Sequence, residues 1–532
     1  MSWRLDLLLG AALALLYPLI ALRRMVLDGF TRIPGDLVDG RLMPLFLEHS
    51  WLWLTRQPHH LDLWGLPFFY PAGGNALAFS DAMLGYAPLY WPWRALGLAP
   101  DTSYQMWLLA AFAASAAAGY AFFRVLGLSP LAAAPACWLA AFSASRLHHV
   151  SHPQLLPLFY LFLALGAAAL YPRLASRNRR GWAAAVMAGA VVAQLYSGFY
   201  LGFFLVLALG LVAGLALILP RPRRALLPRL RQDLAVWLLV AAVGAGALLP
   251  WLAHYRAAHE LTGARKWSDV RRWVPQPGSW VYVTPRALVY RRLGVARVQT
   301  GLGDRFEHAV GLGWLTTAAA LAAALAGRRD PRVQLAAGTA LALMAATTTL
   351  GGGWEPWRWL VTALPPLGAA RAIVRVGLLL PIAAAICLAC WVDRARGLRR
   401  SLLLAVLLLA GIEQLARVGS RHKGEQRARE SYIAERIDPT ADAFYAVRKG
   451  RYPPPPLLHV DAMWASVRTG VPTVNGHSGV LPPDWGALRP ARFRTPQERD
   501  AALQAWLARR GRPGARVQVI EIPRRARGPA KE

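Results

Sequence analysis

The sequence predicts an all-α polytopic membrane protein with about eleven transmembrane helices, and both its composition and its apolar runs indicate this fold class. Of 532 residues, 56% are hydrophobic and only 17% are charged. The mean hydropathy of +0.32 is too high for a soluble protein of this length. Runs of ~17–22 apolar residues recur through the first 415 positions, and each is long enough to cross a ~30 Å hydrocarbon core.

The apolar runs define the expected spans in order along the chain. We predict that the first run is a retained helix rather than a signal peptide, because Tyr17-Pro18 and Arg23-Arg24 follow with no small-residue cleavage site. The expected spans lie near 7–22, 104–123, 131–147, 154–171, 183–197, 200–219, 234–252, 310–326, 333–350, 376–392 and 401–415.

Arginines between the spans predict the orientation of the chain. With the N-terminus in the cytoplasm, the inside connectors contain Arg173, Arg177, Arg179, Arg180, Arg221, Arg223, Arg224, Arg229, Arg231, Arg328, Arg329, Arg332, Arg394, Arg396, Arg399 and Arg400. The short connectors 148–153 and 197–200 on the other side contain no arginine or lysine. The positive-inside rule then places the N-terminus inside and the C-terminus outside. The net charge is +32, and the arginines alternate with the spans instead of forming one stripe. This distribution indicates membrane topology and not nucleic-acid binding.

The long segments between spans all fall on the predicted outer face. They are a first loop of about 24–103, the segments 253–309 and 351–375, and a tail from about 416. The first loop is rich in Trp, Tyr and Pro, which favours helices lying at the membrane interface, with a turn at 71–75. We therefore predict a transmembrane module over 1–415 and a small extracytoplasmic C-terminal domain over 416–532.

The tail has the pattern of a small α/β domain. Thr495 to Glu498 form a capping box with proline at the first helical position, which predicts a helix to about Arg510. Gly511 can end that helix, and the segment VQVIEI at 517–522 predicts a strand.

Two acids stand near the start of the first outside loop, in the segment IPGDLVDGRLMPLFLEHSW at 33–51. If this segment is helical, Asp36 and Asp39 share one face, with Arg41 beside Asp39. A carboxylate there can take a proton from an acceptor hydroxyl. The alternative is structural: one acid caps the helix that follows by accepting backbone N–H bonds.

Further candidates for binding lie at the same predicted face. His148, His149, His152 and Gln154 follow the third span, where they can bind zinc, bind a sugar or phosphate, or cap the helix. Arg371 and Arg375 stand one helical turn apart, a spacing suited to phosphate oxygens or to lipid headgroups. The loop at 253–309 adds Arg271, Arg272, Asp304, Glu307 and His308; its glycines lack the strand–helix frame of a nucleotide site.

The segments PGDLVDGR, FFYPAGGNALAFSDAMLGYAPLYWP, RLHHVSHPQLLPLFY and PPLGAARAIVRVGLLLP give the chain a diffuse resemblance over roughly residues 1–415. It resembles the GT-C class of polytopic membrane glycosyltransferases, and the last three segments also resemble uncharacterised bacterial YfhO-like relatives of that class.

The resemblance implies a base in the first outside loop, which falls on Asp36 or Asp39, and a polyprenyl-phosphate-linked sugar as donor. It further implies a lipid or glycan acceptor, no cofactor, and the bacterial inner membrane as location. Arg41, Arg371, Arg375, His149, His152, Gln154, Glu307 and His308 are the expected binding residues.

Two other function classes fit parts of the sequence. A transporter or flippase of lipid-linked solutes predicts charges near mid-membrane, and the spans here are almost free of charge at their centres. A non-catalytic membrane scaffold with an outside binding domain has the same sequence pattern as the enzyme.

Overall fold

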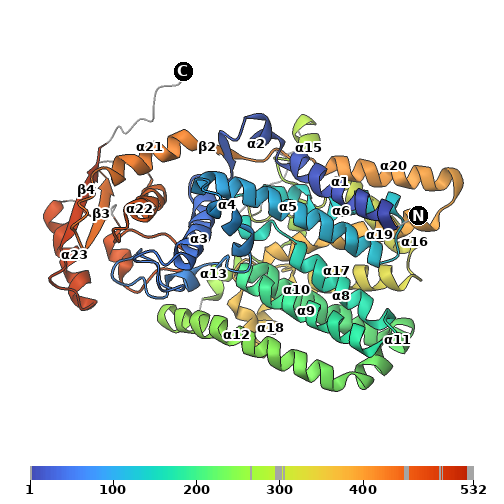
Figure 1. The fold of residues 1–532 in the computed structure, drawn as a ribbon. Helices are drawn as coiled ribbons and strands as arrows, with labels where there is room; N and C mark the ends of the chain where they lie inside the picture. Colours follow the sequence, from blue (N-terminus) through green and yellow to red (C-terminus); the bar gives the residue numbers. More distant parts are fainter. Residues whose placement is uncertain are drawn as a thin grey trace. The chain divides into compact units, whose positions relative to one another are not determined.

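The computed structural model describes residues 3–263, 266–293, 302, 306–448, 454–489, 493 and 495–523. The chain forms two compact units, each assembled from separated stretches (Figure 1). Unit 1 contains Met1–Arg23, Leu108–Ala247 and Arg265–Gly419. Unit 2 contains Arg24–Trp107, Leu248–Ala264 and Ser420–Glu532. The predicted domain boundary at 415/416 lies close to the start of the last stretch, but unit 2 also takes in most of the first outside loop.

Among its described residues, unit 1 contains helices and connecting loops but no β-strand. Two of its helices, α5 and α12, continue into unit 2. Its elements are α1 (Trp3–Ala21), α5 (Pro100–Val125), α6 (Pro130–Ala141), α7 (Ala144–His148), η3 (Pro153–Leu155), α8 (Phe159–Leu170), η4 (Tyr171–Arg173), α9 (Arg177–Ser197), α10 (Phe199–Ile218), α11 (Pro220–Gln232), α12 (Leu234–Thr262), α13 (Trp267–Arg271), α14 (Pro277–Val281), α15 (Leu288–Arg292), α16 (Trp314–Ala326), α17 (Pro331–Thr347), α18 (Pro356–Ala363), η6 (Pro365–Ala369), η7 (Ile373–Leu379), α19 (Leu380–Arg394) and α20 (Gly397–Glu413).

The helices of unit 1 are apolar in the manner of a multi-pass membrane protein. In the described part of the chain, six are long and apolar enough to span a membrane: Arg4–Ala21, Pro100–Val125, Pro153–Arg173, Phe199–Ile218, Leu234–Leu261 and Ile373–Arg394. Each of the remaining predicted spans also coincides with helical structure, but those helices are shorter or more polar. The count of eleven spans therefore stays a prediction.

Burial distinguishes the central helix of unit 1 from a peripheral one. The window Ile373–Arg394 is 89% buried, and α19 packs against α6, α16, α17 and α20. By contrast, the apolar stretch 234–250 of α12 has no buried residue, although Trp251 and Ala258 further along the helix are buried. An apolar stretch of this length without a buried residue requires a lipid environment or a partner.

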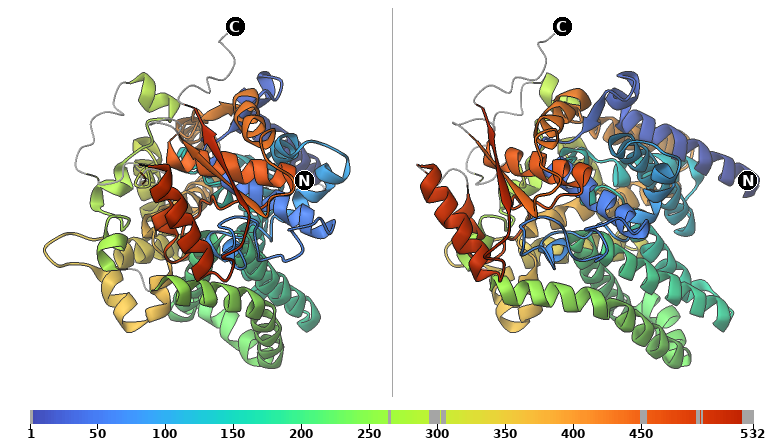
Figure 2. Two further views of the ribbon diagram at one scale, coloured as in Figure 1. Left: turned by 90° about the vertical axis from the view of Figure 1, so that its left-hand side faces the viewer. Right: turned by 60° about the vertical axis from the view of Figure 1, so that its left-hand side comes forward.

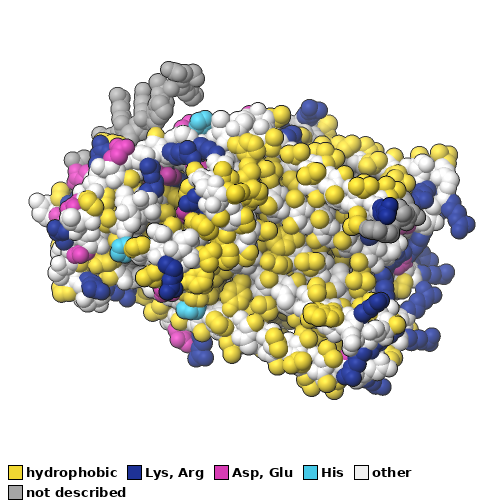
Figure 3. Space-filling model, in the orientation of Figure 1, with side chains coloured by type: hydrophobic (Ala, Val, Ile, Leu, Met, Phe, Trp, Pro, Cys, Tyr) yellow, Lys and Arg dark blue, Asp and Glu magenta, His cyan; other side chains and the backbone are white. Residues whose placement is uncertain are grey.

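The predicted cytoplasmic arginines meet at one end of unit 1. Arg221 Nη1 donates to the carbonyl of Arg329 at 2.9 Å, and Arg332 Nη1 donates to that of Leu126 at 2.9 Å. Arg394 and Arg332 both pair with Asp330. Figure 3 shows Lys and Arg gathered where Figure 1 labels α11 and α20, beside a broad hydrophobic face. The structure therefore groups these connectors as the positive-inside pattern predicts.

Unit 2 combines short helices with two small sheets. Its elements are α2 (Arg23–Leu27), β1 (Arg32–Pro34), α3 (Asp39–Leu54), η1 (Ala76–Phe79), η2 (Ala87–Leu89), α4 (Trp91–Ala95), β2 (Ser420–His422), α21 (Lys423–Ala434), β3 (Ala443–Arg448), α22 (Pro455–Thr469), η8 (Trp485–Leu488), α23 (Pro496–Arg509) and β4 (Val517–Ile522). The predicted helix after Thr495 and the strand at 517–522 are both confirmed, and Thr495 caps α23 by accepting the N–H of Glu498.

The tail elements of unit 2 form a layered arrangement around two strands. Strands β3 and β4 pair in parallel, with Ala443 opposite Val517. Helices α21 and α22 cover one face through a core that includes Phe444, Leu458 and Ile520. Figures 1 and 2 show α23 on the other side of the strands. Strand β1 of the first loop pairs antiparallel with β2, and this pairing ties the loop to the tail.

Candidate functional site

The loop at 34–40 carries the two candidate acids. One buried arginine of unit 2 holds the backbone of this loop. Arg421 lies on β2, and its guanidinium donates to the carbonyls of Pro34 at 3.1 Å, Asp36 at 2.9 Å and Gly40 at 2.8 Å. A Cβ at residue 40 would lie 3.0 Å from Arg421 Nη1, so any larger residue would require this guanidinium to shift. Burial lowers the pKa of Arg421 to about 10, which leaves the guanidinium charged at neutral pH.

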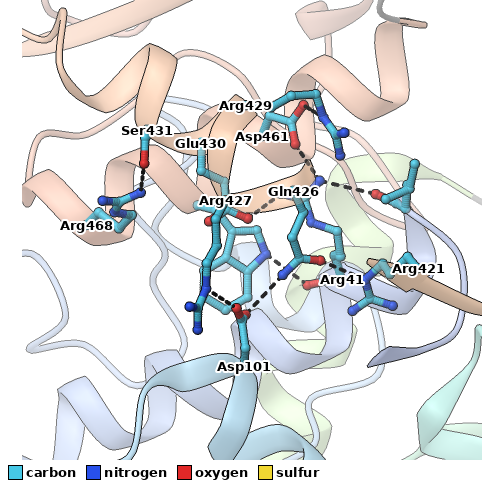
Figure 4. Close-up of polar contacts among 12 residues, drawn as sticks. Arg41, Asp101, Arg421, Gln426, Arg427, Arg429, Glu430, Ser431, Asp461 and Arg468 are labelled. Atoms are coloured by element: carbon cyan, nitrogen blue, oxygen red, sulfur yellow. Dashed lines mark hydrogen bonds and ion pairs between the residues drawn. The ribbon is translucent and has the colours of Figure 1, made fainter. Parts of the chain in front are cut away.

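Arg41 holds the same loop by a second buried network, and its expected place beside Asp39 is wrong. Its guanidinium pairs with Glu430 Oε1 at 2.7 Å and with Asp461 Oδ1, and only 1% of the residue is exposed (Figure 4). Because α3 begins at Asp39, residues 39 and 41 point to different sides of the helix. Arg41 already pairs with two carboxylates. We therefore assign it a structural role in place of the predicted role as a phosphate ligand.

Asp36 also has a structural position. It precedes α3 instead of sharing a helical face with Asp39, and its Oδ1 accepts the N–H groups of Val38 at 3.0 Å and Gly40 at 2.9 Å. The N-cap residue of α3 is Val38, so Asp36 is not the N-cap itself, but like a cap it satisfies backbone N–H groups at the start of the helix.

Asp39 is the acid that the loop presents. Its side chain is 45% exposed, and Oδ1 lies 3.3 Å from Nε2 of His477, which is 25% exposed. Next to His477, Ser478 Oγ is buried without a hydrogen-bond partner among the described residues. An open carboxylate in a fixed loop, supported by an imidazole, can accept a proton from a bound hydroxyl.

In unit 1, the structure brings four of the predicted binding residues together around one ion pair. Arg375 binds both carboxylate oxygens of Glu307, at 2.8 and 2.6 Å. His149 and His152 place Nε2 at 3.6 and 3.8 Å from that carboxylate. Burial acts to raise the pKa of Glu307, but Arg375 and His149 outweigh it and hold this pKa well below its usual range. The carboxylate is therefore ionised and matched by Arg375.

The other histidines of unit 1 have structural partners. His148 Nδ1 lies 2.7 Å from Thr284 Oγ1, and His308 bridges Ser279 Oγ and the carbonyl of Arg272. Gln154 is buried against Gly198, where a Cβ would lie 3.1 Å from its carbonyl oxygen. No three His, Cys, Asp or Glu side chains within the described ranges are arranged to hold a metal ion. Asp304 lies outside those ranges.

Arg371 differs from Arg375 in that no described carboxylate pairs with it. The two residues do not share a regular helix turn, because η7 begins only at Ile373. Arg371 and Arg272 place their guanidinium carbons 5.5 and 5.2 Å from the ring centre of Trp273. Within the described chain, Arg371 Nε has no hydrogen-bond partner. Two arginines stacked on an indole can offer parallel N–H groups to a phosphate.

Sequence reasoning missed two residues of unit 2 that the structure places at the acid loop. His477 and Arg421 lie more than 380 positions from their partners in the loop. The segment PTVNGHSGVLPPDW around His477 has the composition of a loop, and Arg421 is one arginine among many. The one available signal is the scarcity of acids, which points to Asp39 but not to what surrounds it.

Comparison with known proteins gives structural neighbours only. No family model and no curated protein matches the sequence. Among solved structures, the chain is similar to the arabinofuranosyltransferase AftD from Mycobacteria, with 18% identity and a TM-score of 0.47 over 85% of this chain and 30% of that one. It is also similar to ArnT from Cupriavidus metallidurans, with 13% identity and a TM-score of 0.34 over 88% and 89% of the two chains. Similarity at this level concerns the course of the backbone and assigns no residue a role.

Proposed function

We propose that the protein transfers a sugar from a polyprenyl-phosphate donor to a hydroxyl acceptor at the extracytoplasmic face of the bacterial inner membrane. The observation that carries this proposal is the carboxylate of Asp39, which is 45% exposed while Arg41 and Arg421 fix the loop behind it. The resemblance of the sequence to the GT-C class and the set of apolar helices support the same function.

In this reaction Asp39 is the general base. Its carboxylate takes the proton of the acceptor hydroxyl while the hydroxyl oxygen bonds to the anomeric carbon of the sugar. The bond from that carbon to the phosphate oxygen breaks, and polyprenyl phosphate leaves with the electron pair. His477 orients the carboxylate through its contact at 3.3 Å. Attack from the side opposite the leaving group inverts the anomeric centre, which is the outcome that the resemblance favours.

Phosphate binding is a separate proposal for unit 1, and Arg371 is the best candidate among the predicted residues of that unit. Its guanidinium lies over the ring of Trp273, and its Nε is buried without a hydrogen-bond partner within the described residues. No described carboxylate forms an ion pair with it. Arg375 is already matched by Glu307. We therefore assign phosphate binding to Arg371, with Arg272 as its partner on the same indole.

The decisive experiment compares Asp39→Asn with Asp36→Asn. Membranes containing equal amounts of each variant receive radiolabelled pentosyl and hexosyl polyprenyl phosphates, and transfer to lipid and glycan acceptors is measured. Asn keeps the size of Asp but cannot accept a proton at neutral pH, so Asp39→Asn lowers turnover ~10²–10⁴-fold. Asp36→Asn retains turnover, because Asn caps a helix nearly as well as Asp.

Two results would overturn the assignment. Normal turnover in Asp39→Asn places the base elsewhere. A wild-type protein that binds these donors and transfers none of them is a binding protein of the scaffold class.

A further inference from the structure

Unit 1 contains a large apolar cavity at its arginine-rich end, away from the histidine cluster. The cavity has a volume of about 630 Å³, within the ~300–1,000 Å³ typical of small-molecule sites. Its wall is built from α5, α8, α9, α10, α17 and α19, and it includes Leu161, Leu205 and Ile386. A hydrocarbon chain suits such a wall, because the wall offers almost no hydrogen-bonding groups.

Helix α11 closes the cavity on one side and is amphipathic. Its apolar residues Leu226 and Leu230 line the cavity, whereas Arg223 and Arg224 are exposed and do not. A basic amphipathic helix of this kind lies in the membrane interface, with its arginines toward anionic headgroups. The sequence analysis used these arginines only to orient the chain.

Three arginines stand among the lining residues, and two of them have unneutralised charge. Arg332 pairs with Asp330. Arg173 and Arg221 are exposed, and the hydrogen bonds recorded for them go to the backbone carbonyls of Val125 and Arg329. The neighbouring carboxylate of Asp233 is already paired with Arg180. Cationic donors therefore stand beside an apolar cavity at the end of unit 1 that we predict to be cytoplasmic.

We infer that this cavity binds an anionic phospholipid, with one acyl chain in the apolar space and the phosphate on Arg173 and Arg221. Charge complementarity selects the occupant: a neutral lipid would fill the cavity but leave both guanidinium groups without an anion. Basic pockets between transmembrane helices on the cytoplasmic side bind such headgroups. The site is independent of the proposed transfer reaction and uses none of its residues.

The test measures lipid binding by the full-length protein in mild detergent, using native mass spectrometry. Dioleoyl phosphatidylglycerol and dioleoyl phosphatidylcholine are added in turn, with inorganic phosphate as a further probe. Phosphatidylglycerol is expected to bind ~10-fold or more tightly than phosphatidylcholine, and inorganic phosphate alone is expected not to bind measurably. The double variant Arg173→Gln/Arg221→Gln is expected to bind phosphatidylglycerol ~30-fold more weakly, about 5-fold for each arginine removed.

A matched control separates the site from general surface charge. Arg223→Gln/Arg224→Gln removes the same charge from α11 but no lining residue, and is expected to change the affinity by no more than ~2-fold. Ala336→Phe, which fills the cavity from α17, is expected to abolish binding of both lipids. If Ala336→Phe does not fold, the comparison of the two arginine double variants still tests the inference.

Three outcomes would overturn the inference. They are equal binding of the two lipids, equal loss in the two arginine double variants, and co-purification of a polyprenyl lipid in place of a phospholipid.

Discussion

Among single residues, burial separates the arginines that hold the fold from those that can meet a ligand. Arg375 and Glu307 are both about 5% exposed and form a bidentate pair, whereas Arg371 is partly exposed and its buried Nε has no hydrogen-bond partner among the described residues. A buried ion pair that loses one member leaves an uncompensated charge in a low-dielectric site. The two arginines, only four positions apart, therefore have different expected phenotypes.

We predict that Arg375→Gln destabilises the protein by ~3–5 kcal/mol, because Glu307 then stays buried without its cation. Arg371→Gln is expected to keep stability within ~0.5 kcal/mol and to weaken donor use at limiting donor. Thermal unfolding in detergent and transfer kinetics measure the two effects. The double variant Arg375→Gln/Glu307→Gln should regain most of the lost stability. A stable Arg375→Gln that loses only donor affinity would show that Arg375 meets the ligand.

The acid pair shows how far residue types alone can be interpreted. The sequence indicates that an acid near the first span either caps a helix or acts on a substrate. Asp36 accepts backbone N–H groups at the start of α3, whereas the side chain of Asp39 is 45% exposed beside His477, and its role as the base stays a prediction. The expected contact of Arg41 with Asp39 is wrong because a helix turns 200° over two residues, about ~100° per position. Residue spacing predicts which side chains share one face of a helix. It does not predict the distant partners of Arg41, Glu430 and Asp461.

At the scale of elements, the acid loop depends on a strand from the far end of the sequence. Arg421 donates to three carbonyls of the loop, and a lysine at this position has one compact ammonium group in place of the planar fork. Both β1–β2 pairing and this clamp belong to unit 2.

We predict that Arg421→Lys lowers the free energy of unfolding by ~2–4 kcal/mol, since buried carbonyls lose charge-assisted hydrogen bonds. Turnover should fall as well, because Asp39 is no longer held in place. Arg427→Lys is the control: its exposed pair with Asp101 is worth less than ~1 kcal/mol, and the variant should resemble wild type. Urea unfolding and transfer assays report both quantities. Equal stability of the two variants would remove Arg421 from its positioning role.

A second feature at this scale is a buried pair of histidines, formed by His49 of α3 and His60 in the segment after that helix. His49 Nδ1 and His60 Nδ1 lie 2.8 Å apart, and His49 Nε2 donates to the carbonyl of Leu63. The atoms at 2.8 Å share one proton, so a further proton on either ring is unfavourable. Burial lowers the pKa of His49 to about 4 and that of His60 to about 3.

The sign of the pH dependence follows from these shifts. Both pKa values lie below the ordinary 6.5, so the pair contributes stability above about pH 6.5 and loses it as the pH falls toward 4. We predict that the melting temperature drops over this interval, and that His49→Gln/His60→Gln flattens the drop. His59→Asn, at an exposed neighbouring position, should keep the wild-type profile. Parallel profiles for wild type and the double Gln variant would assign the acid sensitivity to other groups.

At the scale of the whole molecule, local signals predict the helices and distant contacts decide how they assemble. Each predicted span coincides with helical structure, because length and apolarity are properties of the segment itself. Which chain segments assemble into unit 2 could not be predicted, because β1 and β2 lie 388 positions apart and neither strand has a distinctive sequence pattern. The His–Glu–Arg cluster of unit 1 was foreseen as a set of candidates, but not as one ion pair.

The orientation of the chain gives a prediction for intact cells. The native cysteines Cys137, Cys387 and Cys390 are buried, so the background of thiol labelling is low. A membrane-impermeant maleimide added outside is expected to label Asp500→Cys on α23 and not Arg224→Cys on α11, since the positive-inside rule predicts that the arginine-rich end faces the cytoplasm. Permeabilised cells should show both positions labelled. Labelling of both positions in intact cells would mean that one span has been miscounted.

The pairing of β1 with β2 also has a consequence for biosynthesis. A ribosome releases Asp39 and its loop early, but the strand and arginine that fix the loop, residues 420–422, follow only after every predicted span has been made. Until then the loop lacks its anchor, so the nascent chain can insert completely and still be inactive. The acid that is among the first residues translated is thus among the last to reach its working geometry.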